Sequence, residues 1–168
     1  RGEDPDVGAL LITGAGTAFC AGGDVKGMAN AGPAVEMTPD QKVARLKERQ
    51  RTLTGALVAV RKPTVAALPG PAAGAGLAIA LACDIRIVSS SAFISTGYAR
   101  VGLSGDYGIV WLLTRLVGTA KARELLFTAD RVDSATCERL GLVNRVVPDE
   151  SFRDDAFAFA KSLADGPA

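Results

Sequence analysis

The stretch KPTVAALPGPAAGAGLAIALACDIRI, Lys62 to Ile87, holds two strand patterns and one helix pattern in a single run. The apolar segment PTVAAL at 63–68 is typical of a buried strand, and DIRIVS at 84–89 indicates a second one. Between them, small residues lead directly into LAIALAC at 77–83, which predicts a helix. Strand, helix and strand in succession are characteristic of an α/β protein.

The flanking sequence continues this alternation. Val7 to Thr13 and the segment NRVV at 144–147 predict further strands. Helices are expected over residues 40–60, 109–116, 120–127, 134–140 and 149–163. No repeat or low-complexity tract divides the chain, so residues 1–168 are expected to form a single domain.

Composition excludes several classes of function. The net charge is +1 and aromatic residues make up 5%, which argues against nucleic acid and anionic membranes as partners. No apolar run reaches the roughly 20 residues that span a bilayer. The chain has no histidine, which removes Ser-His-Asp catalysis and disfavours a metal site. Three scattered cysteines, Cys20, Cys83 and Cys137, fit reduced thiols in the cytoplasm.

A second glycine-rich segment, LLITGAGTAFCAGGDVKG, covers Leu10 to Gly27. A dinucleotide-binding fingerprint would need a third glycine where Phe19 stands, and a helix where the pair Gly22-Gly23 interrupts it. The dinucleotide interpretation therefore fails. Glycines without side chains still let backbone N–H groups approach a ligand, although a tight turn is the simpler alternative.

The small residues Gly74-Ala75-Gly76 stand at the start of the helix predicted over 77–83. Unpaired N–H donors and the positive end of the helix dipole lie there, so the site suits an anion or a developing oxyanion. Close packing of the helix on the sheet is the alternative. Two glycine-rich segments, each after a strand, are what a two-donor oxyanion hole requires.

Three segments together resemble the crotonase (enoyl-CoA hydratase/isomerase) superfamily over nearly the whole chain. They are FCAGGDVKGM at 19–28, the stretch at 62–87, and AFISTGYARVGLSGDYGIVWLLTRLVGTAKARELLFTADRVDSATCERLGLVNRVV at 92–147. The resemblance implies an α/β spiral of ββα units, here without the first strands and the C-terminal helices, which would expose apolar residues near 110–117 and in the last helix. It also implies an acyl-CoA thioester substrate, no cofactor beyond the coenzyme A of that substrate, and a homotrimer or dimer of trimers.

The resemblance assigns roles to individual residues. The amides of Gly23 and Ala75 would form the oxyanion hole; the family usually has glycine at the second place, and alanine keeps the N–H. The segment of Ala21, Gly23 and Asp24 would hold the adenine of coenzyme A. Lys26 would contact a phosphate, with an ordinary surface lysine as the alternative.

The catalytic carboxylates depart from the family pattern. Hydratases of the family use two glutamates, which would fall at Ala78 and at Gly97 or Tyr98, and none of these residues is acidic. Paired carboxylates around a water are therefore absent in their usual form.

Asp106, in GLSGDYG, resembles the aspartate of family members that shift double bonds, among them the dienoyl-CoA and epoxyphenylacetyl-CoA isomerases. One carboxylate beside an oxyanion hole is enough to move a proton along an enoyl thioester. Asp106 could instead cap the helix that follows. Asp84 is expected to be structural. We therefore expect an isomerase, with a hydratase or a non-catalytic CoA-thioester binding protein as alternatives.

Overall fold

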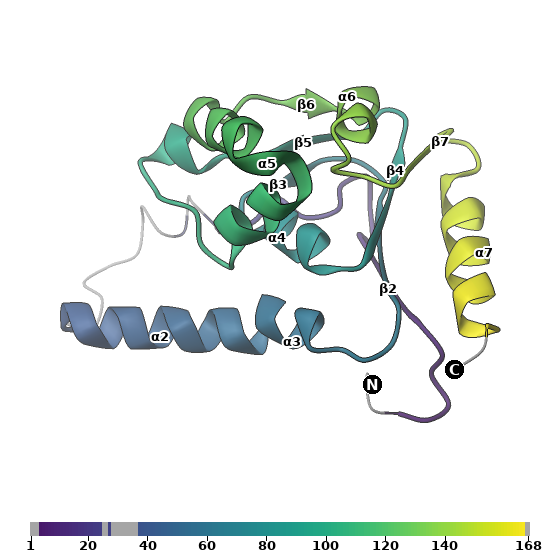
Figure 1. Cartoon of the computed structure of the whole chain (residues 1–168), viewed down its shortest axis with the longest axis horizontal. Coiled ribbons are helices and arrows are strands. Elements are labelled where there is room, and N and C mark those ends of the chain that lie inside the picture. Colours follow the sequence, from purple (N-terminus) through teal and green to yellow (C-terminus); the bar gives the residue numbers. More distant parts are fainter. Residues whose placement is uncertain (1–3, 25–26, 28–36, 167–168) are drawn as a thin grey trace.

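A four-stranded parallel sheet lies at the centre of the fold, in the order β1-β2-β4-β7 (Figure 1). The computed structural model describes residues 4–24, 27 and 37–166. The four strands are β1 (Leu10–Thr13), β2 (Thr64–Leu68), β4 (Ile85–Ser89) and β7 (Arg145–Val147). This confirms the α/β class. The first strand begins three residues later than the pattern from Val7 predicts.

A second, smaller sheet has the order β3-β5-β6. Its strands are β3 (Ala72–Ala73), β5 (Phe93–Ser95) and β6 (Val132–Asp133), with the first pair parallel and the second antiparallel. Sequence reasoning missed all three, because two or three residues are too few to show the alternation of a strand.

The helices are close to those predicted, with two differences. They are α2 (Pro39–Thr52), α3 (Thr54–Val58), α4 (Ala75–Ala82), the 3₁₀ turn η1 (Tyr98–Val101), α5 (Ile109–Thr128), α6 (Ser134–Arg139) and α7 (Phe152–Ala164). The helix expected over 40–60 is broken at Leu53, whose φ of −110° and ψ of −87° are not helical. The two helices expected over 109–127 meet at Gly118, which has a positive φ of 76°. No helix in the described part of the chain is long and apolar enough to cross a membrane.

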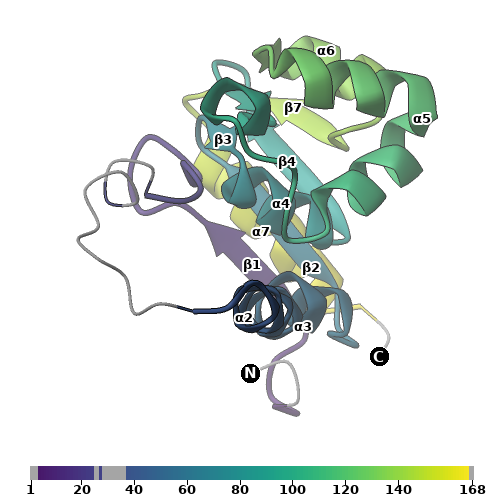
Figure 2. The ribbon, with the colours of Figure 1, turned by 90° about the vertical axis from the view of Figure 1, so that its left-hand side faces the viewer.

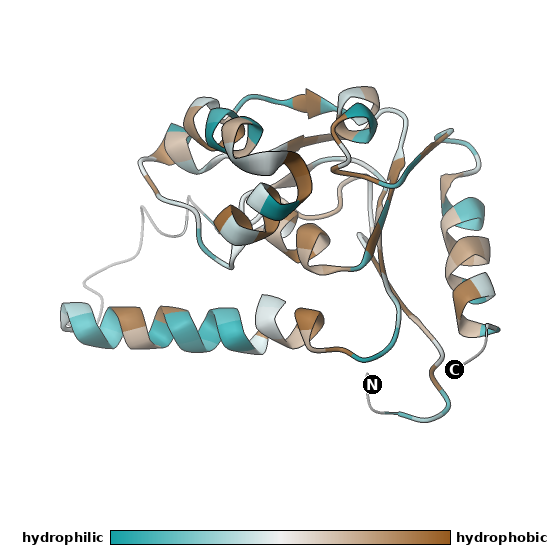
Figure 3. Ribbon diagram, in the orientation of Figure 1, coloured by the Kyte–Doolittle hydropathy of each residue, from teal (hydrophilic) through white to brown (hydrophobic). Residues whose placement is uncertain are grey.

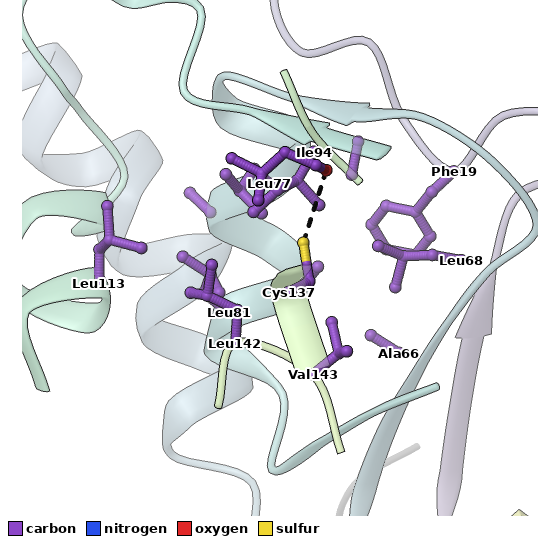
Figure 4. Close-up of a cluster of buried hydrophobic side chains, with 14 of the residues drawn as sticks. Phe19, Ala66, Leu68, Leu77, Leu81, Ile94, Leu113, Cys137, Leu142 and Val143 are labelled. Carbon is purple, nitrogen blue, oxygen red and sulfur yellow. Dashed lines mark hydrogen bonds between the residues drawn. The ribbon is translucent and has the colours of Figure 1, made fainter. Parts of the chain in front are cut away.

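Helices cover both faces of the main sheet (Figures 1 and 2). Because side chains alternate along a strand, β2 contributes to two hydrophobic clusters, one on each face of the sheet. Val65 and Ala67 pack with α7 in the first cluster, and Ala66 and Leu68 belong to the second. Figure 4 shows the second cluster, to which α4 and α6 contribute Leu77 and Cys137. All of β2 is buried, as its unbroken apolar pattern predicts.

Polar contacts secure the ends of the strands. The Oδ2 atom of Asp84 accepts hydrogen bonds from the amide of Thr64 at 2.8 Å and from its hydroxyl at 2.7 Å, which ties β4 to β2. The expected structural role of Asp84 is thereby confirmed. Arg86 is 5% exposed, and its guanidinium donates to the carbonyls of Cys83 and Leu142 at 2.6 and 2.7 Å.

Helix α2 extends from the body of the molecule, is largely hydrophilic, and has no buried residue (Figures 1 and 3). It begins with a capping box, in which the Thr38 hydroxyl accepts from the Gln41 amide and the Gln41 side chain accepts from the Thr38 amide. Exposed apolar residues occur elsewhere where the sequence predicts them, at Val110 and Trp111 of α5 and at Phe157 of α7.

Asp149 gives the fold an expected sensitivity to acid. Its carboxylate accepts hydrogen bonds from the Ser89 and Ser90 hydroxyls at 2.5 and 2.8 Å and from the Ser91 amide at 3.0 Å. These bonds hold the pKa of Asp149 well below its usual range. A depressed pKa stabilises the fold above the unfolded value of about 3.9, and this contribution is lost as the pH falls below it.

We therefore expect Asp149→Asn to lower the melting temperature at pH 7 and to flatten its decline between pH 5 and pH 3. The control is Glu150→Gln, which removes the adjacent carboxylate. Thermal unfolding followed across this pH range would contradict the assignment if both variants kept the parent's acid sensitivity.

Candidate active site

The two glycine-rich segments meet at a cavity of about 410 Å³. Residues 20–23 form one wall, and residues 73–76, at the junction of β3 and α4, form the next. Leu46 and Arg49 of α2 and Leu53, at the junction of α2 and α3, form another wall, and the segment from Gly97 to Tyr107 closes the remaining side. Every wall thus comes from a different part of the sequence, which only the fold brings together.

The backbones of the two segments are in direct contact. The amide of Ala73 donates to the carbonyl of Cys20 at 3.0 Å, and a Cβ atom built on Gly22 would lie 2.7 Å from the Ala73 oxygen and 3.2 Å from the Ala75 nitrogen. A side chain at Gly22, whose φ is +87°, would therefore collide with this wall. By standard backbone dimensions, the amide nitrogens of Gly23 and Ala75 lie within about 7 Å of each other.

Gly23 and Ala75, whose amides are the predicted oxyanion donors, both line the cavity. Ala75 is the first residue of α4, so its N–H has no partner within the helix, and it lies at the positive end of the helix dipole. In the part of the chain that the structure describes, neither the Gly23 nor the Ala75 amide donates a hydrogen bond. Two such donors facing one cavity can stabilise negative charge on an oxygen atom.

Asp106 lines the same cavity and is half-buried. Its Oδ1 atom accepts a hydrogen bond of 2.7 Å from the hydroxyl of Tyr98. The alternative that Asp106 caps the following helix is wrong: the N-cap of α5 is Gly108, and no side chain caps it. Among the described residues, no other carboxylate lines the cavity.

The positions where hydratases of the family carry their two glutamates differ in their access to the cavity. Ala78, where the first glutamate would stand, is fully buried within α4 and does not line the cavity. Gly97 and Tyr98, the two places where the second would fall, both line it. One of these two positions thus presents a phenol to the cavity.

The residues expected to hold coenzyme A lie in different surroundings. Ala21 and Gly23 line the cavity. Asp24 does not line the cavity, and its carboxylate accepts a hydrogen bond from the Gly27 amide at 2.8 Å. Lys26 lies outside the described residues.

Known proteins similar in sequence to this chain are named enoyl-CoA hydratases. Residues 2–168 match the family model described as enoyl-CoA hydratase/isomerase. The chain is 38% identical over 162 residues to a protein of Mycobacterium bovis named "Probable enoyl-CoA hydratase", and 36% identical over 160 residues to one of the same name from Rhodobacter capsulatus. These alignments cover 96% and 95% of this chain, and the chain spans 60% of the length of each relative.

Solved structures also resemble the fold of this chain. The crystal structure of an enoyl-CoA hydratase from Bacillus anthracis superposes with a TM-score of 0.86 at 30% identity, over 98% of this chain and 62% of that one. A structure from Mycobacterium avium subsp. paratuberculosis, also titled as an enoyl-CoA hydratase, gives 0.85 at 31% identity, over 99% of this chain and 63% of that one. The fold is therefore that of the crotonase class. Within it, the chain belongs to the enoyl-CoA hydratase/isomerase family.

Proposed function

We propose that this chain carries the active site of an enzyme that shifts the double bond of an enoyl-CoA thioester. The observation that carries the proposal is the combination, in one cavity, of two backbone amides and one carboxylate, Asp106; among the described residues the amides have no acceptor and no second carboxylate lines the cavity. The relatives' names supply the thioester class, and the cavity supplies the groups that isomerisation needs.

In the proposed reaction, Asp106 takes a proton from C2 of a 3-enoyl thioester. The electron pair of the broken C–H bond delocalises onto the thioester oxygen, where the Gly23 and Ala75 amides stabilise the negative charge. Asp106 then returns the proton to C4, which leaves a 2-enoyl thioester. The step consumes no water and needs no cofactor beyond the coenzyme A of the substrate.

Hydration of a 2-enoyl thioester is the second candidate, because the relatives are named hydratases. It would require Asp106 to activate a water without the usual pair of glutamates. A non-catalytic CoA-thioester binding protein is the third candidate, suggested by the missing glutamates. We propose a homotrimer or dimer of trimers in the cytoplasm. The exposed apolar residues Val110 and Trp111 of α5 are consistent with such an assembly.

Product analysis separates the three candidates. Incubation with 3-enoyl-CoA is expected to give 2-enoyl-CoA, detected by the absorbance of the conjugated thioester and by mass spectrometry. Formation of 3-hydroxyacyl-CoA from 2-enoyl-CoA, without isomerisation, would favour the hydratase. Binding of either thioester without turnover would favour the binding protein.

A further inference from the structure

We propose that Tyr98 is a positioning residue for Asp106. Its hydroxyl holds one oxygen of the carboxylate, so that the other oxygen is presented to the substrate as the base. The inference rests on the proposed function, since it gives Tyr98 a part in the proton transfer that isomerisation requires.

Tyr98 is fixed more firmly than the aspartate that it contacts. Its ring packs in the core with 7% of the residue exposed. It opens the turn η1 between Gly97 and Gly102, which both have positive φ, and its carbonyl accepts from the Leu103 amide at 3.0 Å. The phenol oxygen is therefore held in place by core packing and by the backbone on either side.

The hydrogen bond from Tyr98 makes the two carboxylate oxygens of Asp106 inequivalent. Oδ1 of Asp106 accepts from Tyr98 at 2.7 Å, whereas Oδ2 has no hydrogen-bond partner in the described part of the chain. Rotation about the side-chain torsion would exchange the two oxygens, and the bond opposes it. A base held in one orientation reaches a near-attack geometry more often than a freely rotating one.

The Tyr98 hydroxyl remains protonated and can donate. Burial, followed by the hydrogen bond with Asp106, raises the pKa of Tyr98 above its ordinary value. The other titratable or charged side chains that line the cavity are Arg49, Cys20 and Tyr107, and removal of the Tyr98 hydroxyl leaves all three in place.

The test is Tyr98→Phe in the full chain, assayed with 3-enoyl-CoA. Loss of a hydrogen bond to a charged group is expected to lower kcat about tenfold. Because Tyr98 orients the base and is not proposed to bind the thioester, KM should stay within about twofold of the parent value. The matched control is Tyr107→Phe, which removes a phenol oxygen from the same cavity but not from Asp106, and should not show this selective loss of kcat.

A second variant keeps the hydrogen bond. A 3-fluorotyrosine at position 98 retains the phenol donor, and it should keep most of the parent's kcat. A parent-like kcat in Tyr98→Phe, with the parent enzyme active, would overturn the inference and leave the proposed function standing.

A readout independent of turnover separates the two failures. In a double-mutant cycle of Tyr98→Phe and Asp106→Ala, the losses in melting temperature should be less than additive, because the two residues share one hydrogen bond. Without isomerase activity in the parent, the proposed function fails, and this cycle still decides whether Tyr98 holds the carboxylate. Additive losses would overturn that contact as well.

Discussion

Replacing Ala75 by proline is expected to lower kcat for isomerisation by roughly 10²–10³, or about 2.7–4 kcal/mol of transition-state stabilisation. Ala75 is the first residue of α4, the position where proline is best tolerated because its missing N–H has no helical partner. The substitution therefore deletes one oxyanion donor and leaves the helix intact. Steady-state kinetics with 3-enoyl-CoA, together with circular dichroism, would measure the effect.

The matched control is Ala75→Gly, which keeps the N–H and restores the residue usual in the family. It should retain most of the activity. Turnover of the proline variant within a few-fold of the parent, in a protein with an unchanged spectrum, would rule out the Ala75 amide as an oxyanion donor. Parallel losses in both variants would point instead to damage at the start of α4.

The sequence alone predicted the parts of the site that depend on local backbone requirements. A glycine at position 22 and small residues at 74–76 are needed wherever two backbones touch, and the structure places these segments in contact through Gly22 and Ala75. Strand β2 and helix α4 were predictable for a similar reason, since burial on all sides leaves an unbroken apolar pattern.

What the sequence could not predict depends on tertiary contacts. The helix breaks at Leu53, two residues before Gly55, and a lone glycine in a helical pattern does not fix the place of a break. The break falls where the chain passes from the exposed α2 to α3, which packs on α4. The partner of Asp106 could not be predicted either. Local rules favour an aspartate as a helix cap, but here the buried phenol of Tyr98 lies within reach of the carboxylate, and Gly108 takes the cap position.

Asp106→Asn is expected to lower kcat/KM for isomerisation by roughly 10² or more, because the amide cannot accept the proton. Its carbonyl oxygen can still accept the hydrogen bond from Tyr98, so the free energy of unfolding should stay close to that of the parent. Binding of the CoA thioester should also persist, since the Gly23 and Ala75 amides are untouched. Kinetics, calorimetric titration with a substrate analogue and thermal unfolding would test these three expectations together.

Asp106→Ala is the matched control for stability. It removes the acceptor of the buried Tyr98 hydroxyl and should cost on the order of 1 kcal/mol of stability in addition to the loss of turnover. Full isomerase activity in the Asn variant would overturn the role of Asp106 as the base. Loss of 3-hydroxyacyl-CoA formation in that variant, from a parent that hydrates but does not isomerise, would instead assign Asp106 to the activation of water.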